Sequence, residues 1–135
     1  MKAIAYNVLE CEKRHLAEAN SKVHDLTLIS NELNQSTIHY SVGKEAVVIS
    51  DRDVLDEKML FELYKIGVRY ITSRSHTVLH IDLLKAEALK LHIARVSDSN
   101  STAEIAEHTI ANLTQWTLQG CSSSICPCHS SKYKR

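Results

Sequence analysis

Glycine is scarce in this sequence, and the few glycines are scattered. Only three occur in 135 residues, Gly43, Gly67 and Gly120, so the chain has no glycine-rich loop to cradle a dinucleotide. The longest apolar runs are a few residues, far short of the roughly 20 that cross a membrane. The start, MKAIAYNVLEC, lacks an apolar core of signal-peptide length. We therefore expect a cytoplasmic protein with reduced thiols.

A surplus of charge of one sign is also absent. Sixteen basic residues balance sixteen acidic ones, so no overall field would attract nucleic acid or an anionic membrane. One Trp, one Phe and five Tyr are too few for a basic stripe interleaved with aromatic side chains. We expect neither a nucleic-acid nor a membrane partner. The length fits a single domain with a core of its own.

Strand and helix patterns alternate along the chain. Short apolar runs predict strands at 2–8, 25–30, 46–50, 68–73 and 93–96. Helical spacing predicts helices at 10–22 and 36–42, one capped by Asp53 or Asp56 with Met59, Leu60, Leu63 and Ile66 buried, one from Asp82 to about Lys90, and one at 102–119 with Ile105, Ile110, Leu113 and Leu118 apolar. This alternation predicts an α/β domain with a flavodoxin-like, five-stranded parallel sheet covered by helices on both faces.

The most specific pattern runs from residue 67 to residue 115. It reads GVRYITSRSHTVLHIDLLKAEALKLHIARVSDSNSTAEIAEHTIANLTQ and contains an RSHTVLHID loop and an IAEHTIANL helix. In these motifs, and in the order of elements, the sequence resembles the substrate-binding half of the D-isomer-specific 2-hydroxyacid dehydrogenases, in particular the D-lactate dehydrogenase branch. The resemblance implies that residues 1–119 form a substrate domain.

The resemblance implies a substrate-binding site in the loop of Arg74, Ser75, His76 and Thr77. In the family, backbone N–H groups around a glycine of an Arg-Ser-x-Gly loop hold the substrate carboxylate, and Thr77 replaces that glycine here. A β-branched residue resists a positive φ, which predicts a distorted anion nest. The alternative is an ordinary loop whose histidines, His76 and His80, are solvated.

Two other polar residues have simpler interpretations. Asp51 follows the third predicted strand, as a receiver-domain phosphoacceptor would, but the acidic pair and the lysine that such a site needs are missing from 7–9 and 96–98. We interpret Asp51 as a turn or capping residue. His108, in the Ala-Glu-His segment, is interpreted as structural and packed against a neighbouring helix or loop.

The chemical groups of the resembled family lie outside this pattern. Its substrate-orienting Arg, its Glu, its general acid–base His and its Gly-x-Gly-x-x-Gly cradle for NAD all belong to the other half of the enzyme. We therefore assign no catalytic residue and no bound NAD to this chain. The resemblance predicts a truncated or degenerate dehydrogenase domain, inactive alone, whose partners are a small 2-hydroxy or 2-keto acid and a separate nucleotide-binding chain.

Residues 120–135 break the alternating pattern and are rich in cysteine and serine. Cys121, Cys126, Cys128 and His129 supply three thiolates and an imidazole, which are ligands suited to zinc or copper(I). One prediction is a disordered tail. The other is a non-enzymatic module or subunit whose tail binds metal or senses redox state.

Overall fold

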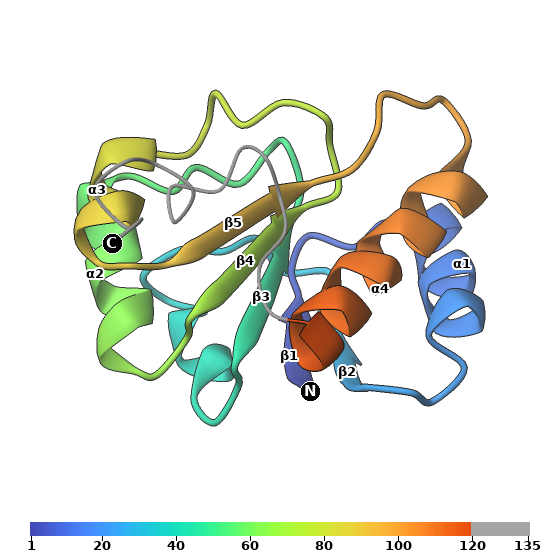
Figure 1. The fold of residues 1–135 in the computed structure, drawn as a ribbon, viewed down its shortest axis with the longest axis horizontal. Coiled ribbons are helices and arrows are strands. Elements are labelled where there is room, and N and C mark those ends of the chain that lie inside the picture. Colours follow the sequence, from blue (N-terminus) through green and yellow to red (C-terminus); the bar gives the residue numbers. More distant parts are fainter. Residues whose placement is uncertain (120–135) are drawn as a thin grey trace.

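The computed structural model describes residues 1–119 of the chain, which contain a five-stranded parallel sheet between two helical layers (Figure 1). The strands are β1 (Lys2–Ala5), β2 (Asp25–Leu28), β3 (Ala46–Ile49), β4 (Tyr70–Ser73) and β5 (His92–Arg95). Their order is β2-β1-β3-β4-β5, and every neighbouring pair is parallel. This is the flavodoxin-like order, and the predicted α/β class and parallel sheet are confirmed.

Helices cover both faces of the sheet. Helices α1 (Glu10–Asn20) and α4 (Thr102–Gln119) lie together on one face, and α2 (Glu57–Lys65) and α3 (Leu83–Ala88) lie on the other (Figure 1). A short 3₁₀ helix, η1 (Ile38–Ser41), precedes β3. Because both faces are covered, all four residues of the central strand β3 are buried, which explains its continuous apolar run.

The two faces of β3 contribute to two separate cores. Val47 and Ile49 pack with the buried side chains of α2 and α3, whereas Ala46 and Val48 pack with those of α1 and α4. This alternation follows from the two-residue period of a strand. The side chains of β3 are larger on the face covered by α2 and α3, with valine and isoleucine, than on the face covered by α1 and α4, with alanine and valine.

Side-chain caps fix where three helices begin. Asp56 accepts a hydrogen bond from the Met59 N–H at 2.9 Å and caps α2, and Asp82 accepts one from the Lys85 N–H at 3.1 Å and caps α3. At the start of α4 the Glu104 N–H donates to the Ser101 hydroxyl at 3.2 Å. Serine and aspartate are favoured at these positions. Asp56, and not Asp53, is therefore the cap of α2.

Several predicted boundaries change in the structure. The short helix expected at 36–42 is the 3₁₀ turn η1, and α3 ends at Ala88, shortly before Lys90 adopts a φ of 60°. The first strand ends at Ala5 because Asn7, at φ 58°, turns the chain. Leu118, expected on the apolar face of α4, is 74% exposed. Within residues 1–119, no helix combines the length and apolar character that a bilayer crossing demands.

Candidate functional site

An open cleft of about 620 Å³ lies at the carboxyl ends of β3, β4 and β5. The residues that line it follow these strands, apart from Arg95, which ends β5, and Ile105, which lies at the start of α4; they are Asp51, Arg74, Ser75, His76, Thr77, Val78, Leu79, Arg95, Val96, Ser97, Asp98, Ser99 and Ile105. All four predicted substrate-binding residues are among them. Ligands in parallel α/β domains gather at this edge of the sheet.

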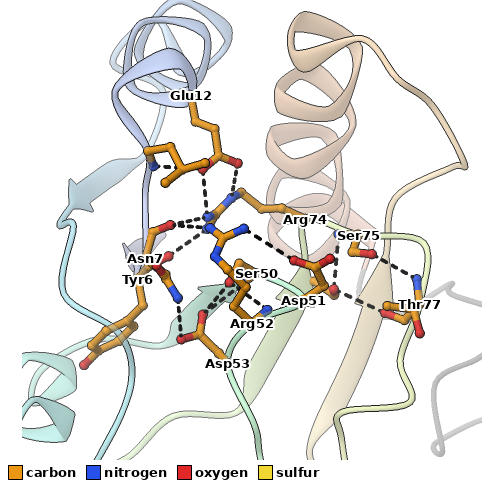
Figure 2. Close-up of polar contacts among 12 residues, drawn as sticks. Tyr6, Asn7, Glu12, Ser50, Asp51, Arg52, Asp53, Arg74, Ser75 and Thr77 are labelled. Carbon is orange, nitrogen blue, oxygen red and sulfur yellow. Dashed lines mark hydrogen bonds and ion pairs between the residues drawn. The ribbon is translucent and has the colours of Figure 1, made fainter.

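The loop after β4 is held by its own hydroxyl groups. The N–H groups of Ser75, Thr77 and Leu79 each donate to a serine or threonine hydroxyl two residues earlier, at 3.2 Å in each case (Figure 2 shows the bond from Thr77 to Ser75). Such bonds are typical of serine and threonine turns. Among the described residues, nothing accepts a hydrogen bond from the N–H groups of His76 and Val78.

Thr77 fits this loop without a left-handed backbone. The residues other than glycine that have a positive φ in the described part of the chain are Asn7, Ser21, Lys22 and Lys90. The strain expected from threonine at a glycine position is therefore absent. Within residues 1–119 the loop leaves the alternate N–H groups of His76 and Val78 without an acceptor, and both residues line the cleft.

The side chain of Arg74 is buried and hydrogen-bonded to other parts of the protein. Its guanidinium forms two contacts with the Glu12 carboxylate, at 3.1 and 3.2 Å, and donates to the backbone carbonyls of Tyr6 and Asn7 at 3.0 Å each (Figure 2). The Arg74 side chain is 2% exposed and that of Glu12 is 19% exposed. Arg74 therefore joins the loop after β4 to the start of α1. A contact between Arg74 and substrate stays a prediction.

Asp53 organises the neighbouring loops from a position that is 1% exposed. Its carboxylate accepts hydrogen bonds from the Ser50 N–H at 2.9 Å, the Ser50 hydroxyl at 3.1 Å, the Leu33 N–H at 3.0 Å and the Asn7 amide at 3.4 Å (Figure 2). These donors follow β1, β2 and β3. Sequence reasoning considered Asp53 as a helix cap and missed this role, although an aspartate just after a buried strand was the available signal.

Two histidines tie the cleft walls together. His76 Nδ1 lies 3.1 Å from the Val96 carbonyl, which links the loops after β4 and β5. His108 Nδ1, on α4, accepts a hydrogen bond from the Ser97 N–H at 2.9 Å. The interpretation of His108 as a structural residue packed against a loop is confirmed. Together these bonds fix the wall of the cleft that β5 and α4 share.

The cleft carries charges of both signs. Asp51 forms an exposed ion pair with Arg52 at 3.5 Å, as expected of a turn residue. An Arg95 guanidinium N–H donates to the His76 carbonyl at 3.4 Å. Asp98 is exposed, and no ion pair of Asp98 occurs in the part of the chain that the structure describes. Arg95 is therefore the cation best placed to meet an anionic ligand.

The predicted metal ligands Cys121, Cys126, Cys128 and His129 lie outside the described residues. Within residues 1–119, no group of three or more His, Cys, Asp or Glu side chains is arranged to hold a metal ion. The chemistry that the described residues offer is therefore hydrogen bonding and charge, directed into the cleft.

His80 lies at the end of the loop between β4 and α3 in an unfavourable environment. Both ring nitrogens are buried and have no hydrogen-bond partner in residues 1–119. Burial lowers the pKa of His80 below its usual 6.5, and the negative charges of Asp51 and Asp53 and an interaction with the Ser50 backbone only partly oppose this shift. The Ser50 interaction does not have the geometry of a hydrogen bond. Unpaired buried polar atoms cost folding free energy, so this ring destabilises the fold.

We expect His80→Leu to raise the free energy of unfolding, because leucine removes two unpaired nitrogens. The gain should grow as the pH falls below 6.5, since a histidine with a lowered folded-state pKa takes up its proton preferentially in the unfolded chain. Urea unfolding of both proteins at about pH 8 and about pH 5 measures the difference. His24, whose pKa burial also lowers, is present in both proteins and cancels. A gain that shrinks in acid would contradict this account.

Comparisons with known proteins agree with the fold. No protein-family profile matches the chain. The chain is 35% identical to the D-lactate dehydrogenase kk1H of Curvularia clavata over 92 residues, which are 68% of this chain and 26% of that protein. It is 32% identical to the D-lactate dehydrogenase of Escherichia coli over 111 residues, 82% of this chain and 33% of that protein.

Solved structures give the same result. The structure of Salmonella D-lactate dehydrogenase superposes with a TM-score of 0.69 at 31% identity, over 85% of this chain and 35% of that one. The apo-structure of the Escherichia coli D-lactate dehydrogenase gives a TM-score of 0.68 at 32% identity, over 71% and 31%. The fold is thus an α/β domain of the kind that D-lactate dehydrogenases contain. The chain is a homologue of the D-lactate and D-2-hydroxyacid dehydrogenases and spans about a third of their length.

Proposed function

We propose that residues 1–119 form the substrate-side domain of a D-2-hydroxyacid dehydrogenase and bind a small 2-hydroxy or 2-keto acid in the cleft. The observation that carries this proposal is the pair of N–H groups, at His76 and Val78, that have no partner within residues 1–119 and belong to residues lining the same cleft as Arg95. Backbone amides at a strand end and a guanidinium are donors suited to a carboxylate. The homology to D-lactate dehydrogenases supports a 2-hydroxy acid as the ligand.

The proposal divides the reaction between two parts. Hydride transfer needs a nicotinamide held against the substrate, and the sequence of 135 residues contains no Gly-x-Gly-x-x-Gly cradle. In this proposal a nucleotide-binding part outside these 135 residues supplies NAD and the catalytic groups, and the present domain orients the acid. Family neighbours include a D-lactate dehydrogenase solved with NAD⁺. The proposal also places the protein in the cytoplasm, which cell fractionation would test.

Binding of the acid is the direct test. We expect isothermal titration to give a saturable signal with D-lactate or pyruvate and none with lactamide, which lacks the carboxylate. Arg95→Gln should weaken binding about tenfold, because it removes one charge-assisted hydrogen bond. Lys22→Gln, outside the cleft, is the matched control and should bind as the unchanged protein does. If no acid binds, or if lactamide binds equally well, the proposal fails.

Turnover gives a second, independent result. The purified chain should not oxidise NADH with any 2-keto acid, because no described residue provides the cofactor site. Addition of a nucleotide-binding chain that co-purifies with it should restore oxidation. Turnover by the chain alone would contradict the division of the reaction between two parts.

A further inference from the structure

The hydrogen bond of His76 fixes the tautomer of its ring. His76 Nδ1 lies 3.1 Å from the Val96 carbonyl oxygen. A carbonyl oxygen can only accept a hydrogen bond, so Nδ1 carries the hydrogen. In the neutral ring Nε2 is then left with an unshared electron pair and acts as an acceptor. The Val96 carbonyl, in the loop after β5, therefore determines that Nδ1 of His76 donates and that Nε2 accepts.

The other ring nitrogen is available to a ligand. His76 lines the cleft and its side chain is exposed. Within residues 1–119, no hydrogen bond occupies Nε2, and none occupies the His76 backbone N–H. A residue that lines the cleft thus has a backbone donor and a ring acceptor that no other described residue uses. A 2-hydroxy acid offers the matching groups, a carboxylate that accepts and a hydroxyl that donates.

We propose that His76 is a specificity-determining residue that accepts a hydrogen bond from the 2-hydroxyl of the bound acid through Nε2. This inference rests on the proposed function of the cleft. A 2-keto acid has only an acceptor oxygen at carbon 2. The Nε2 electron pair would then face an electron pair of the keto oxygen, and no hydrogen bond would form. With a neutral His76 the cleft therefore favours the 2-hydroxy acid over the corresponding 2-keto acid.

The charged groups that line the cleft around His76 are Asp51 after β3, Arg74 at the end of β4, Arg95 on β5 and Asp98 beyond it, and α4 contributes only the apolar Ile105. Arg74 is already paired with Glu12. In this proposal Arg95 meets the carboxylate of the acid, and Nε2 of His76 meets its hydroxyl.

The test compares D-lactate with pyruvate by isothermal titration of the full chain. At about pH 8 we expect D-lactate to bind about tenfold more tightly, the value of one well-formed hydrogen bond. His76→Phe should bring the ratio close to one while pyruvate still binds. His39→Phe, an exposed histidine outside the cleft, should leave the ratio unchanged.

Each outcome decides the proposal. A preference for D-lactate that persists in His76→Phe, or a ratio near one in the unchanged protein, overturns the role of His76 and leaves the cleft as a binding site. Absence of binding by both acids overturns the proposed function together with this inference. Imidazole ¹⁵N spectra, with the His76 signal identified by its loss in His76→Phe, provide a separate readout. A hydrogen found on Nε2 of the neutral ring would also overturn the proposal.

Discussion

Replacement of Arg74 by alanine should lower the free energy of unfolding by about 3–5 kcal/mol, the usual cost of removing one partner from a buried ion pair. The guanidinium is 2% exposed and contacts Glu12 at 3.1 and 3.2 Å. Its loss leaves a largely buried carboxylate without its ion-pair partner and removes the hydrogen bond to the Tyr6 carbonyl, whereas the Asn7 carbonyl keeps a hydrogen bond from Arg52 at 3.1 Å. Glu12 also accepts a hydrogen bond from the Leu9 N–H at 2.9 Å, so the start of α1 loosens as well.

Urea unfolding followed by circular dichroism measures this change. Arg14→Ala is the matched control, because Arg14 pairs with Glu18 at 3.1 Å on the same helix that carries Glu12, but with side chains 80% and 66% exposed. Exposed pairs contribute less than about 1 kcal/mol. Arg74→Lys should fall between the two, since a lysine keeps the charge but not the planar set of donors. Equal costs for Arg74→Ala and Arg14→Ala would show that the buried pair adds nothing.

The fold was largely accessible from the sequence because its signals are local. The helix predicted at 102–119 is the helix α4 that the structure contains, since a serine cap and apolar periodicity mark it within the segment itself. The continuous apolar run of β3 and the aspartate caps of α2 and α3 are equally local. Predicted boundaries are wrong where residues distant in the sequence determine the local conformation. At Asn7, for example, the carbonyl is held by Arg74 and the side-chain amide by Asp53.

The candidate site was predictable only in outline. Parallel topology places the loop after β4 at a ligand-binding edge, and all four predicted residues line the cleft. The pairing of Arg74 with Glu12 joins positions 62 residues apart, and no spacing rule reveals such a contact. The bond between His76 and Val96 likewise depends on how two loops meet. Side-chain direction, which decides what a ligand meets, therefore required the structure.

Replacement of Asp53 by alanine is the second change with a large expected effect, about 2–4 kcal/mol of unfolding free energy. Each buried N–H left without a partner costs roughly 1–3 kcal/mol, and the carboxylate satisfies those of Ser50 and Leu33 at 2.9 and 3.0 Å. Asp51→Ala is the neighbouring control, because the Asp51 side chain is 56% exposed and its ion pair with Arg52 is exposed. It should cost less than about 1 kcal/mol.

Asp53 and Arg74 should also be coupled, because both hold Asn7. The Asn7 carbonyl accepts from Arg74 at 3.0 Å, and the Asn7 amide donates to Asp53 at 3.4 Å (Figure 2). Loss of either side chain removes one of the hydrogen bonds that hold Asn7, which also accepts one from Arg52 at 3.1 Å. The double variant should therefore lose at least about 0.5 kcal/mol less than the sum of the single changes. Unfolding of milder variants, Asp53→Asn and Arg74→Lys, permits this cycle if the alanine pair does not fold. Strictly additive changes in the free energy of unfolding would mean that Asp53 and Arg74 stabilise the loops after β1, β3 and β4 independently of each other. Asn7 would then not couple these loops at the edge of the sheet where the cleft lies.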